Sequence, residues 1–143
     1  MTQKYNVAVA GATGAVGTEI IQILEQRDFP IENLFLLASS KSKGKKVEFK
    51  EKELVVEDLS EFDFSKVHIG LFSPGGKISA EYAPKAAKAG CIVIDNTSHF
   101  RMKKDIPLIV PEVNATVLDE FFDDKNRTNI ISNPNCSTIQ MVV

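Results

Sequence analysis

A short apolar run, three evenly spaced glycines and an amphipathic segment follow one another at the start of the chain. Residues 5–10 (YNVAVA) are rich in strand-forming side chains and stop at Gly11, which indicates a buried strand. Residues 15–27 carry apolar side chains at helical spacing. Between these segments, Gly11, Gly14 and Gly17 allow a tight turn and let backbone N–H groups approach a pyrophosphate at a helix N-terminus. The unit predicts a dinucleotide site, and the alternative is an ordinary turn from strand to helix.

The same alternation of apolar runs and helical patterns continues along the chain. Further strands are expected at residues 34–39, 67–73, 91–96, 107–113 and 129–133, and helices at residues 79–90 and 114–122. Gly90 is the expected stop of the first helix, in which Pro84 falls near the start or causes a kink, and Asn114 is the expected N-cap of the second. Residues 46–50 and 53–58 form two short runs that suit a hairpin or a sheet edge. Strands alternating with helices predict an α/β fold, a Rossmann-like doubly wound and mostly parallel sheet with helices on both faces.

In such a sheet, ligands bind beyond the carboxyl ends of the strands. Gly11, Ser73, Asn96 and Cys136 all follow expected strand ends, so we expect them to line one crevice. We therefore assign Ser73, the nearby Gly75 and Asn96 to the cofactor site together with the glycine loop.

The segment after the second expected strand indicates which dinucleotide binds. An NAD-binding chain usually carries Asp or Glu there for the ribose hydroxyls, whereas this chain has hydroxyl and ammonium groups at Ser39, Lys41 and Ser42. These groups suit a 2′-phosphate, which a carboxylate would repel. The segment predicts NADP as the cofactor, and the alternative is a solvated basic loop.

Cys136 follows an Asn-Pro-Asn turn and precedes residues that resemble the start of a helix. A helix N-terminus favours the thiolate, and its N–H groups can hold a developing oxyanion. A buried structural thiol is the equally open alternative, because free cysteine is often buried. Cys91 begins an apolar strand and is expected to lie in the core.

Arg101 lies in a polar segment, residues 95–102 (DNTSHFRM), that follows an expected strand end. Its guanidinium can hold a phosphate or carboxylate with two hydrogen bonds, and a surface ion pair is the alternative.

Charge and composition narrow the classes of partner. The net charge of −2 gives no reason to expect binding of nucleic acid or of an acidic membrane surface. The polar N-terminus has no apolar run behind it, so we expect no membrane span and a cytoplasmic location. The two cysteines and two histidines show no short ligand spacing, so no metal site is expected.

Five motifs together resemble one family. The segments GATGAVG, LASSKSKGK, DNTSHFRM, PLIVPEVN and NPNCSTIQM occur in the order and approximate spacing of aspartate-semialdehyde dehydrogenases, and the resemblance covers the whole chain. It implies NADPH-dependent reductive dephosphorylation of L-4-aspartyl phosphate to L-aspartate 4-semialdehyde. That reaction lies on the route to lysine through diaminopimelate, and to methionine and threonine.

The resemblance also implies roles for single residues. Cys136 matches the nucleophile that forms a thioester, and Arg101 and Asn135 match positions that bind phosphate. Lys41 and Ser42 match contacts to the 2′-phosphate. Lys41 stands where the family usually has arginine, so a weaker preference for NADP is expected. The pyrophosphate loop is matched by Thr13, Gly14, Ala15 and Val16.

Members of this family are longer than this chain. The resemblance therefore implies an NADP-binding domain at residues 1–135 and the start of a catalytic and dimerisation domain at residues 136–143. It implies a homodimer for the complete enzyme, and little turnover here because the family's acid/base histidine lies outside this sequence. Two alternatives remain: N-acetyl-γ-glutamyl-phosphate reductase, which typically has glycine where this chain has Asn135, and a non-catalytic dinucleotide-binding module.

Overall fold

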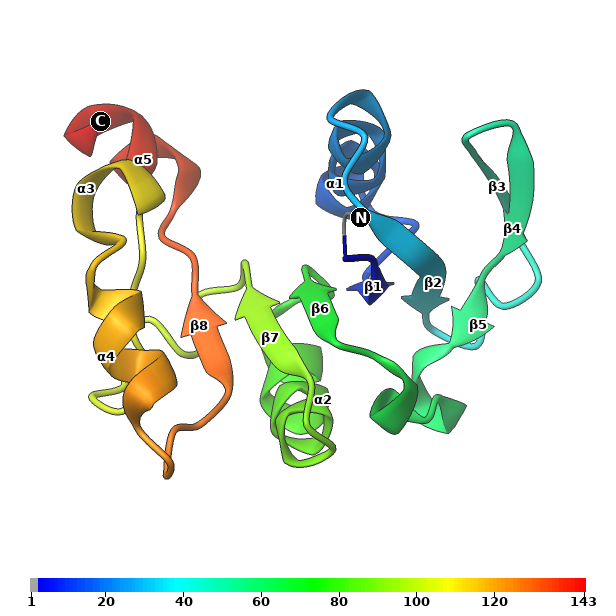
Figure 1. The fold of residues 1–143 in the computed structure, drawn as a ribbon. Coiled ribbons are helices and arrows are strands. Elements are labelled where there is room, and N and C mark those ends of the chain that lie inside the picture. Colours follow the sequence, from blue (N-terminus) through cyan, green and yellow to red (C-terminus); the bar gives the residue numbers. More distant parts are fainter. Residues whose placement is uncertain (1–2) are drawn as a thin grey trace.

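The computed structural model describes residues 3–143 and is built around a six-stranded sheet in which every neighbouring pair of strands is parallel (Figure 1). The strand order is β5-β2-β1-β6-β7-β8. The strands are β1 (Tyr5–Ala10), β2 (Ile31–Ala38), β5 (Glu57–Asp58), β6 (Ile69–Phe72), β7 (Ile92–Asp95) and β8 (Ile130–Ser132). Because the strands are parallel, their carboxyl ends all meet at one edge of the sheet, as the predicted fold requires.

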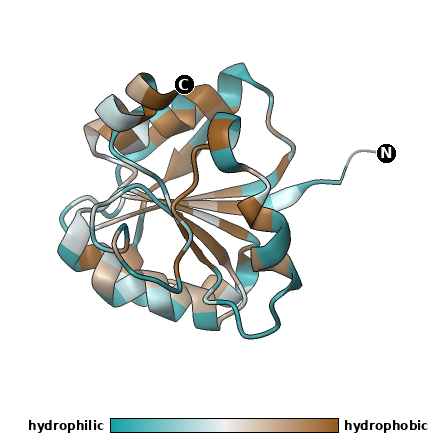
Figure 2. Cartoon of the chain, turned by 90° about the vertical axis from the view of Figure 1, so that its left-hand side faces the viewer, coloured by the Kyte–Doolittle hydropathy of each residue, from teal (hydrophilic) through white to brown (hydrophobic). Residues whose placement is uncertain are grey.

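Helices cover both faces of this sheet, and β1 shows why. Its side chains alternate, so that Val7 and Val9 pack with α1 (Ala15–Gln26) while Ala8 and Ala10 pack with α2 (Gly76–Lys88). In Figure 2 the apolar strands run through the middle of the molecule with helices on either side. Burial on both faces explains the nearly continuous apolar runs, and the predicted doubly wound architecture is confirmed.

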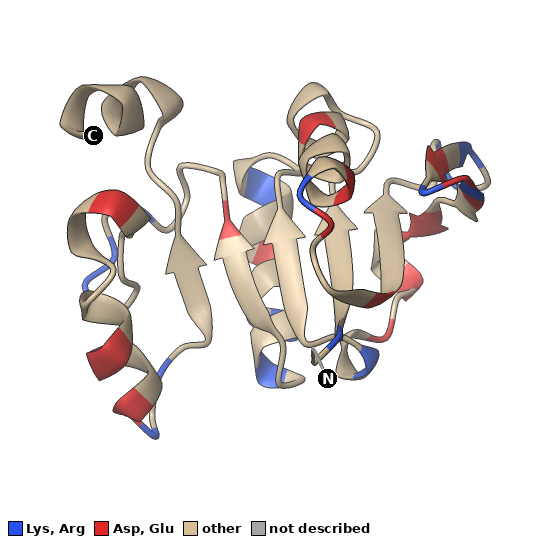
Figure 3. Ribbon diagram, turned by 45° about the horizontal axis from the view of Figure 1, so that its top comes forward, with Lys and Arg blue, Asp and Glu red and all other residues tan. Residues whose placement is uncertain are grey.

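The remaining elements surround this core. β3 (Lys46–Phe49) and β4 (Lys52–Val55) form a separate antiparallel hairpin, as one of the two sequence interpretations predicted. The short helices are η1 (Leu59–Glu61), η2 (Phe64–Lys66), α3 (Pro111–Asn114), α4 (Val117–Asp123) and α5 (Cys136–Val142). Figure 3 shows that charged residues lie mainly on helices and connecting segments, whereas the central strands and α5 are largely without charge.

The expected strand at residues 107–113 does not form. Leu108 makes only an isolated parallel bridge to Ser132, and Pro111 begins α3. Proline has no backbone N–H to donate, so the prolines at both ends of this stretch restrict its pairing with β8.

The predicted helix cap at Asn114 was wrong. Asn114 ends α3, and its side chain folds back to accept the N–H of Val110 and to donate to the carbonyl of Leu108. The following helix, α4, starts only at Val117. A local side-chain bond to the preceding turn thus replaces the expected cap.

The helix before β7 starts earlier than expected. It begins at Gly76, so Pro84 lies in its interior rather than near its start. Its C-terminus agrees with the prediction, because Gly90 follows it with a φ of +96°. Within residues 3–143, the structure has no helix that is both long and apolar enough to cross a membrane.

Candidate functional site

The glycine loop brings the end of β1 into close contact with the segment after β6. Gly11 has a φ of +83°, and a Cβ at this position would lie 2.6 Å from the carbonyl oxygen of Ser73. A Cβ at Gly17 would lie 2.0 Å from the carbonyl oxygen of Gly11. No other residue fits either position without a shift of backbone, so the packing of α1 against the strand ends depends on glycine.

The N-terminus of α1 opens at this loop. Gly14 caps the helix without a side-chain bond, and the first turn contains no acidic residue. The first N–H groups, at Ala15 and Val16, have no partner within the helix, so they and the helix dipole favour an anion. The hydroxyl of Thr13 lies 3.3 Å from that of Ser42, which joins the glycine loop to the loop after β2.

In the loop after β2, serine side chains line a cavity, whereas the lysines lie outside its lining. Ser39 lines a cavity beside the glycine loop, and its carbonyl accepts the N–H of Ser42. Lys41 is exposed and does not line the cavity. Lys43 forms a 3.0 Å ion pair with Glu61, which raises the pKa of this lysine. Lys41 and Lys45 are both exposed, and neither forms an ion pair within the described residues.

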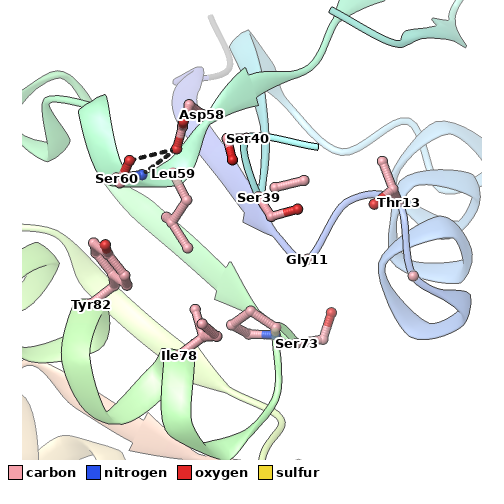
Figure 4. Close-up of a pocket in the computed structure, with 13 residues that line it drawn as sticks. Gly11, Thr13, Ser39, Ser40, Asp58, Leu59, Ser60, Ser73, Ile78 and Tyr82 are labelled. Carbon is pink, nitrogen blue, oxygen red and sulfur yellow. Dashed lines mark hydrogen bonds between the residues drawn. The ribbon is translucent and has the colours of Figure 1, made fainter. Parts of the chain in front are cut away.

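The cavity, of about 450 Å³, lies at the carboxyl ends of β1, β2, β5 and β6 (Figure 4). Its glycine-loop side contains Gly11, Thr13 and Gly14, and Ser73, which follows the neighbouring strand β6, lies beside Gly11. The backbone N–H of Ser73 donates to Ala10 at 2.9 Å, which fixes this residue beside β1. The structure thus brings the glycine loop, Ser39 and Ser73 together, but Asn96 and Cys136, which were expected in the same crevice, do not line this cavity.

The other side of the cavity was not predicted. It is formed by a second set of residues from η1 and α2, together with the residue before η1: Asp58, Leu59, Ser60, Ile78 and Tyr82. A polar Asp-Leu-Ser turn after an apolar run is the sequence signal that could have indicated this side of the cavity. The strand before it, β5, has only two residues and is too short to be recognised from its own sequence.

Six of the eleven predicted cofactor residues lie outside the lining of this cavity: Ala15, Val16, Lys41, Ser42, Gly75 and Asn96. Gly75 caps α2 without a side-chain bond. Asn96 belongs to a second cluster, at the ends of β7 and β8, where its side-chain oxygen accepts a 2.6 Å hydrogen bond from Asn133.

Arg101 holds this second cluster together. Its Nη2 donates to the carbonyl of Asn96 at 3.1 Å, and its Nε donates to the carbonyl of Asn133 at 3.0 Å. A guanidinium has five N–H groups, so further donors remain for an anion. Arg101 therefore links the loops that follow β7 and β8, and does so through carbonyl groups rather than through the ion pair considered from the sequence.

A buried carboxylate lies beneath these loops. Asp95 is 0% exposed, and it accepts hydrogen bonds of 2.7 Å from the hydroxyl of Ser79 and of 2.7 Å from the hydroxyl of Thr97. Asp95 thus ties the loop after β7 to α2. Sequence analysis did not single out this residue, because Ser79 lies 16 positions before it.

The two cysteines differ in environment. Cys136 is the first residue of α5 and is exposed, so the structure does not support a buried structural thiol. Asn135 caps the helix, its side-chain oxygen accepting the N–H of Ser137 at 2.9 Å. Cys91 is buried, and burial raises the pKa of its thiol to about 12. Its core position agrees with the prediction, although it precedes β7 by one residue.

In the described part of the chain, no group of three or more His, Cys, Asp or Glu side chains could hold a metal ion.

The sequence of this chain is similar to those of one family of known proteins. A family model described as semialdehyde dehydrogenase, NAD binding domain, matches residues 6–121. Over 143 residues the chain is 58% identical to aspartate-semialdehyde dehydrogenase 2 of Vibrio cholerae, covering 100% of this chain and 41% of that protein. The chain therefore spans about two fifths of the length of this curated relative.

Solved structures of aspartate semialdehyde dehydrogenases are similar to this chain in fold as well as in sequence. The crystal structure of aspartate semialdehyde dehydrogenase II complexed with ASA from Vibrio cholerae has a TM-score of 0.92 and 56% identity, covering 98% of this chain and 44% of that chain. The structure of the Candida albicans enzyme with NADP has a TM-score of 0.80 and 27% identity, covering 98% of this chain and 45% of that chain.

Proposed function

This chain belongs to the semialdehyde dehydrogenase family, in which it matches the NAD-binding domain, and we propose that it binds NADP(H) and carries the nucleophile of an aspartate-semialdehyde dehydrogenase. The observation that carries the proposal is the cavity of about 450 Å³ onto which the glycine loop opens. There Gly11 passes so close to Ser73 that a side chain is excluded. Glycine at this position allows the tight turn between β1 and α1, which leaves the backbone N–H groups of the loop and of the helix start open to a pyrophosphate.

The cofactor fits this cavity in two parts. The N–H groups at the start of α1 hold the pyrophosphate, through the backbone of Thr13, Gly14, Ala15 and Val16. Ser39, which lines the cavity, and Ser42, which lies beside Thr13, offer hydroxyl groups for the adenosine ribose, and the exposed Lys41 adds a positive charge for a 2′-phosphate. The absence of a carboxylate at the end of β2 supports NADP over NAD. The Candida albicans relative, whose structure is described with NADP, supports the same choice.

The reaction uses Cys136. Its thiolate attacks the carbonyl carbon of L-4-aspartyl phosphate, an acyl-sulfur bond forms, and the bond to phosphate breaks. When bound, the cofactor would supply the hydride that reduces the acyl group. The acyl–sulfur bond then breaks, which releases the aldehyde and returns Cys136 to the thiolate. N–H groups at the start of α5 stabilise the negative charge that develops on the carbonyl oxygen. Free donors of Arg101, with Asn135, hold the departing phosphate.

The complete enzyme needs more than this chain, which covers 41% of its curated relative. The acid/base histidine, the remaining substrate contacts and the homodimer interface are proposed on the family resemblance alone. The cytoplasmic location is proposed from the polar N-terminus. The chain by itself is expected to bind the cofactor with little or no turnover. A non-catalytic dinucleotide-binding module is the second candidate, and the cavity supports it equally, but the exposed Cys136 at a helix start favours the enzyme.

Calorimetric titration of the chain with NADP and with NAD tests the proposal. We expect saturable binding of both cofactors, and tighter binding of NADP. If neither NADP nor NAD binds at millimolar concentration, the proposed function is wrong.

A further inference from the structure

The side of the cavity that faces away from the glycine loop contains a carboxylate with a free oxygen. Asp58 ends β5 and is paired with Ala38 at the end of β2, so it lies beside the loop that begins at Ser39. Its Oδ1 accepts both the backbone N–H of Ser60, at 2.9 Å, and the Ser60 hydroxyl, at 2.7 Å (Figure 4). Both recorded bonds go to one oxygen, so Oδ2 remains available to a ligand in the cavity.

The turn at Asp58 holds its carboxylate in the ionised form. The two hydrogen bonds from Ser60 lower the pKa of Asp58 below its ordinary value, so it stays charged at neutral pH. An ionised carboxylate only accepts hydrogen bonds. The ligand edge that meets Oδ2 must therefore donate.

Apolar side chains lie next to this carboxylate. Leu59 and Ile78 line the cavity from η1 and α2, and Tyr82 lies one helical turn further along α2. Figure 4 shows the Leu59 side chain extending from η1 into the space between Asp58 and Ile78. A flat, mostly apolar ring with one donating edge suits such walls, because its faces can pack on them while its edge reaches the carboxylate.

We propose that Asp58 recognises the adenine base of the dinucleotide by accepting a hydrogen bond from its exocyclic amino group. This inference rests on the proposed function, and it adds a determinant of base specificity at the same site. The 2′-phosphate is a poor partner for Asp58, since two negative charges repel each other. The ribose hydroxyls are the other possible donors, but the proposed function places them beside Ser39, which lines the cavity at the end of β2. The base is the part of the cofactor that needs both an apolar wall and an acceptor.

A cofactor that differs only at this edge tests the inference. In nicotinamide hypoxanthine dinucleotide phosphate, the amino group of NADP is replaced by a carbonyl oxygen, which cannot donate and faces the carboxylate. We expect the hypoxanthine cofactor to bind the unmodified chain about tenfold more weakly than NADP in calorimetry, from the loss of one charge-assisted hydrogen bond.

Asp58→Asn should reverse the preference. If the asparagine oxygen keeps the bonds from Ser60, its amide nitrogen faces the ligand and donates to hypoxanthine rather than accepting from adenine. Asp63→Asn is the matched control. Asp63 caps η2 by accepting the N–H of Ser65 at 3.0 Å and its hydroxyl at 2.7 Å, yet it does not line the cavity. The Asp63→Asn variant should prefer NADP over the hypoxanthine cofactor to the same degree as the unmodified chain.

The outcomes separate the inference from the proposed function. Equal binding of the two cofactors by the unmodified chain would overturn the inference and leave the function standing. Asp58→Asn could instead change the ratio of NADP to NAD affinity and leave the ratio of adenine-cofactor to hypoxanthine-cofactor affinity unchanged. That result would assign the carboxylate to the ribose and overturn the inference too. No binding of any of these dinucleotides would overturn both.

Discussion

The hydroxyl group of Thr13 lies 3.3 Å from the hydroxyl group of Ser42, although the two residues are 29 positions apart in the sequence. Thr13 belongs to the glycine loop after β1, and Ser42 belongs to the loop after β2. Their contact brings the groups proposed to bind the pyrophosphate next to those proposed to bind the 2′-phosphate. The proposed cofactor preference depends on this adjacency.

Lys41→Glu should weaken NADP binding selectively. The change replaces an exposed lysine in the loop after β2 by a negative charge, which repels the 2′-phosphate of NADP. NAD lacks that phosphate, so its binding should change less. We expect the ratio of NADP to NAD affinity to fall roughly tenfold, as measured by calorimetry at low salt. Lys52→Glu, in the β4 hairpin, makes the same change in net charge away from the loop after β2 and should leave the ratio unchanged. An unchanged ratio in Lys41→Glu would mean that the loop after β2 is only a solvated basic segment.

Gly11→Ala should destabilise the fold and remove dinucleotide binding. The added methyl group would lie 2.6 Å from the Ser73 carbonyl oxygen, in a backbone conformation that already disfavours side chains. We expect a loss of roughly 3 kcal/mol in the free energy of unfolding, from strain and overpacking together. Gly44→Ala is the control, because Gly44 has a φ of +91° with open space around it. Its cost should be only about 1–2 kcal/mol. Equal costs in urea denaturation would contradict the close contact at Gly11.

Ser79→Ala should destabilise the chain through Asp95. The change removes one of the two hydroxyl groups that satisfy a fully buried carboxylate, so we expect a loss of about 2 kcal/mol. Ser132 provides a matched control, since it pairs with Asp95 in the sheet and is also fully buried, but its hydroxyl has no hydrogen-bond partner. Ser132→Ala should change the free energy of unfolding by less than ~0.5 kcal/mol. A larger loss for Ser132→Ala than for Ser79→Ala in thermal or urea unfolding would contradict this account of Asp95.

Cys136 should be the reactive thiol of the folded chain. It is exposed at the first position of α5, whereas burial holds the pKa of Cys91 near 12 and keeps that thiol protonated at neutral pH. We expect iodoacetamide to label Cys136 roughly 100-fold faster than Cys91 at pH 8, with the sites assigned by peptide mapping. In denaturant the two rates should become similar. Faster labelling of Cys91 in the folded chain is the result that this assignment cannot accommodate.

The features that could be predicted from the sequence are those in which neighbouring residues determine the structure. The strand, glycine loop and helix at the N-terminus follow from adjacent residues, and so does the helix that begins at Cys136. The parallel sheet followed from the alternation of strand and helix patterns. Pro84 was harder to place, because α2 begins at Gly76, three residues before the expected helix.

Features that depend on distant partners could not be predicted. β5 consists of two residues, and Asp58 reaches the cavity only because it pairs with Ala38. The carbonyl partners of Arg101 come from two different loops. Asn114 carried a good cap signal, but two bonds to the preceding turn outweighed it. For Asp58 the decisive contact joins segments whose proximity the local sequence does not encode, whereas for Asn114 two local bonds compete with the expected cap.

The most direct test of the central claim is to map NADP binding on the amide NMR spectrum of this chain. If the cavity is the dinucleotide site, saturable shifts should centre on the glycine loop, on Ser39 to Ser42, on Asp58 to Ser60 and on Ser73. The β3–β4 hairpin turn at Lys50 and Glu51 should not respond. Saturable shifts that leave the glycine loop unperturbed, or no shifts at millimolar NADP, would contradict the assignment of this cavity to the cofactor.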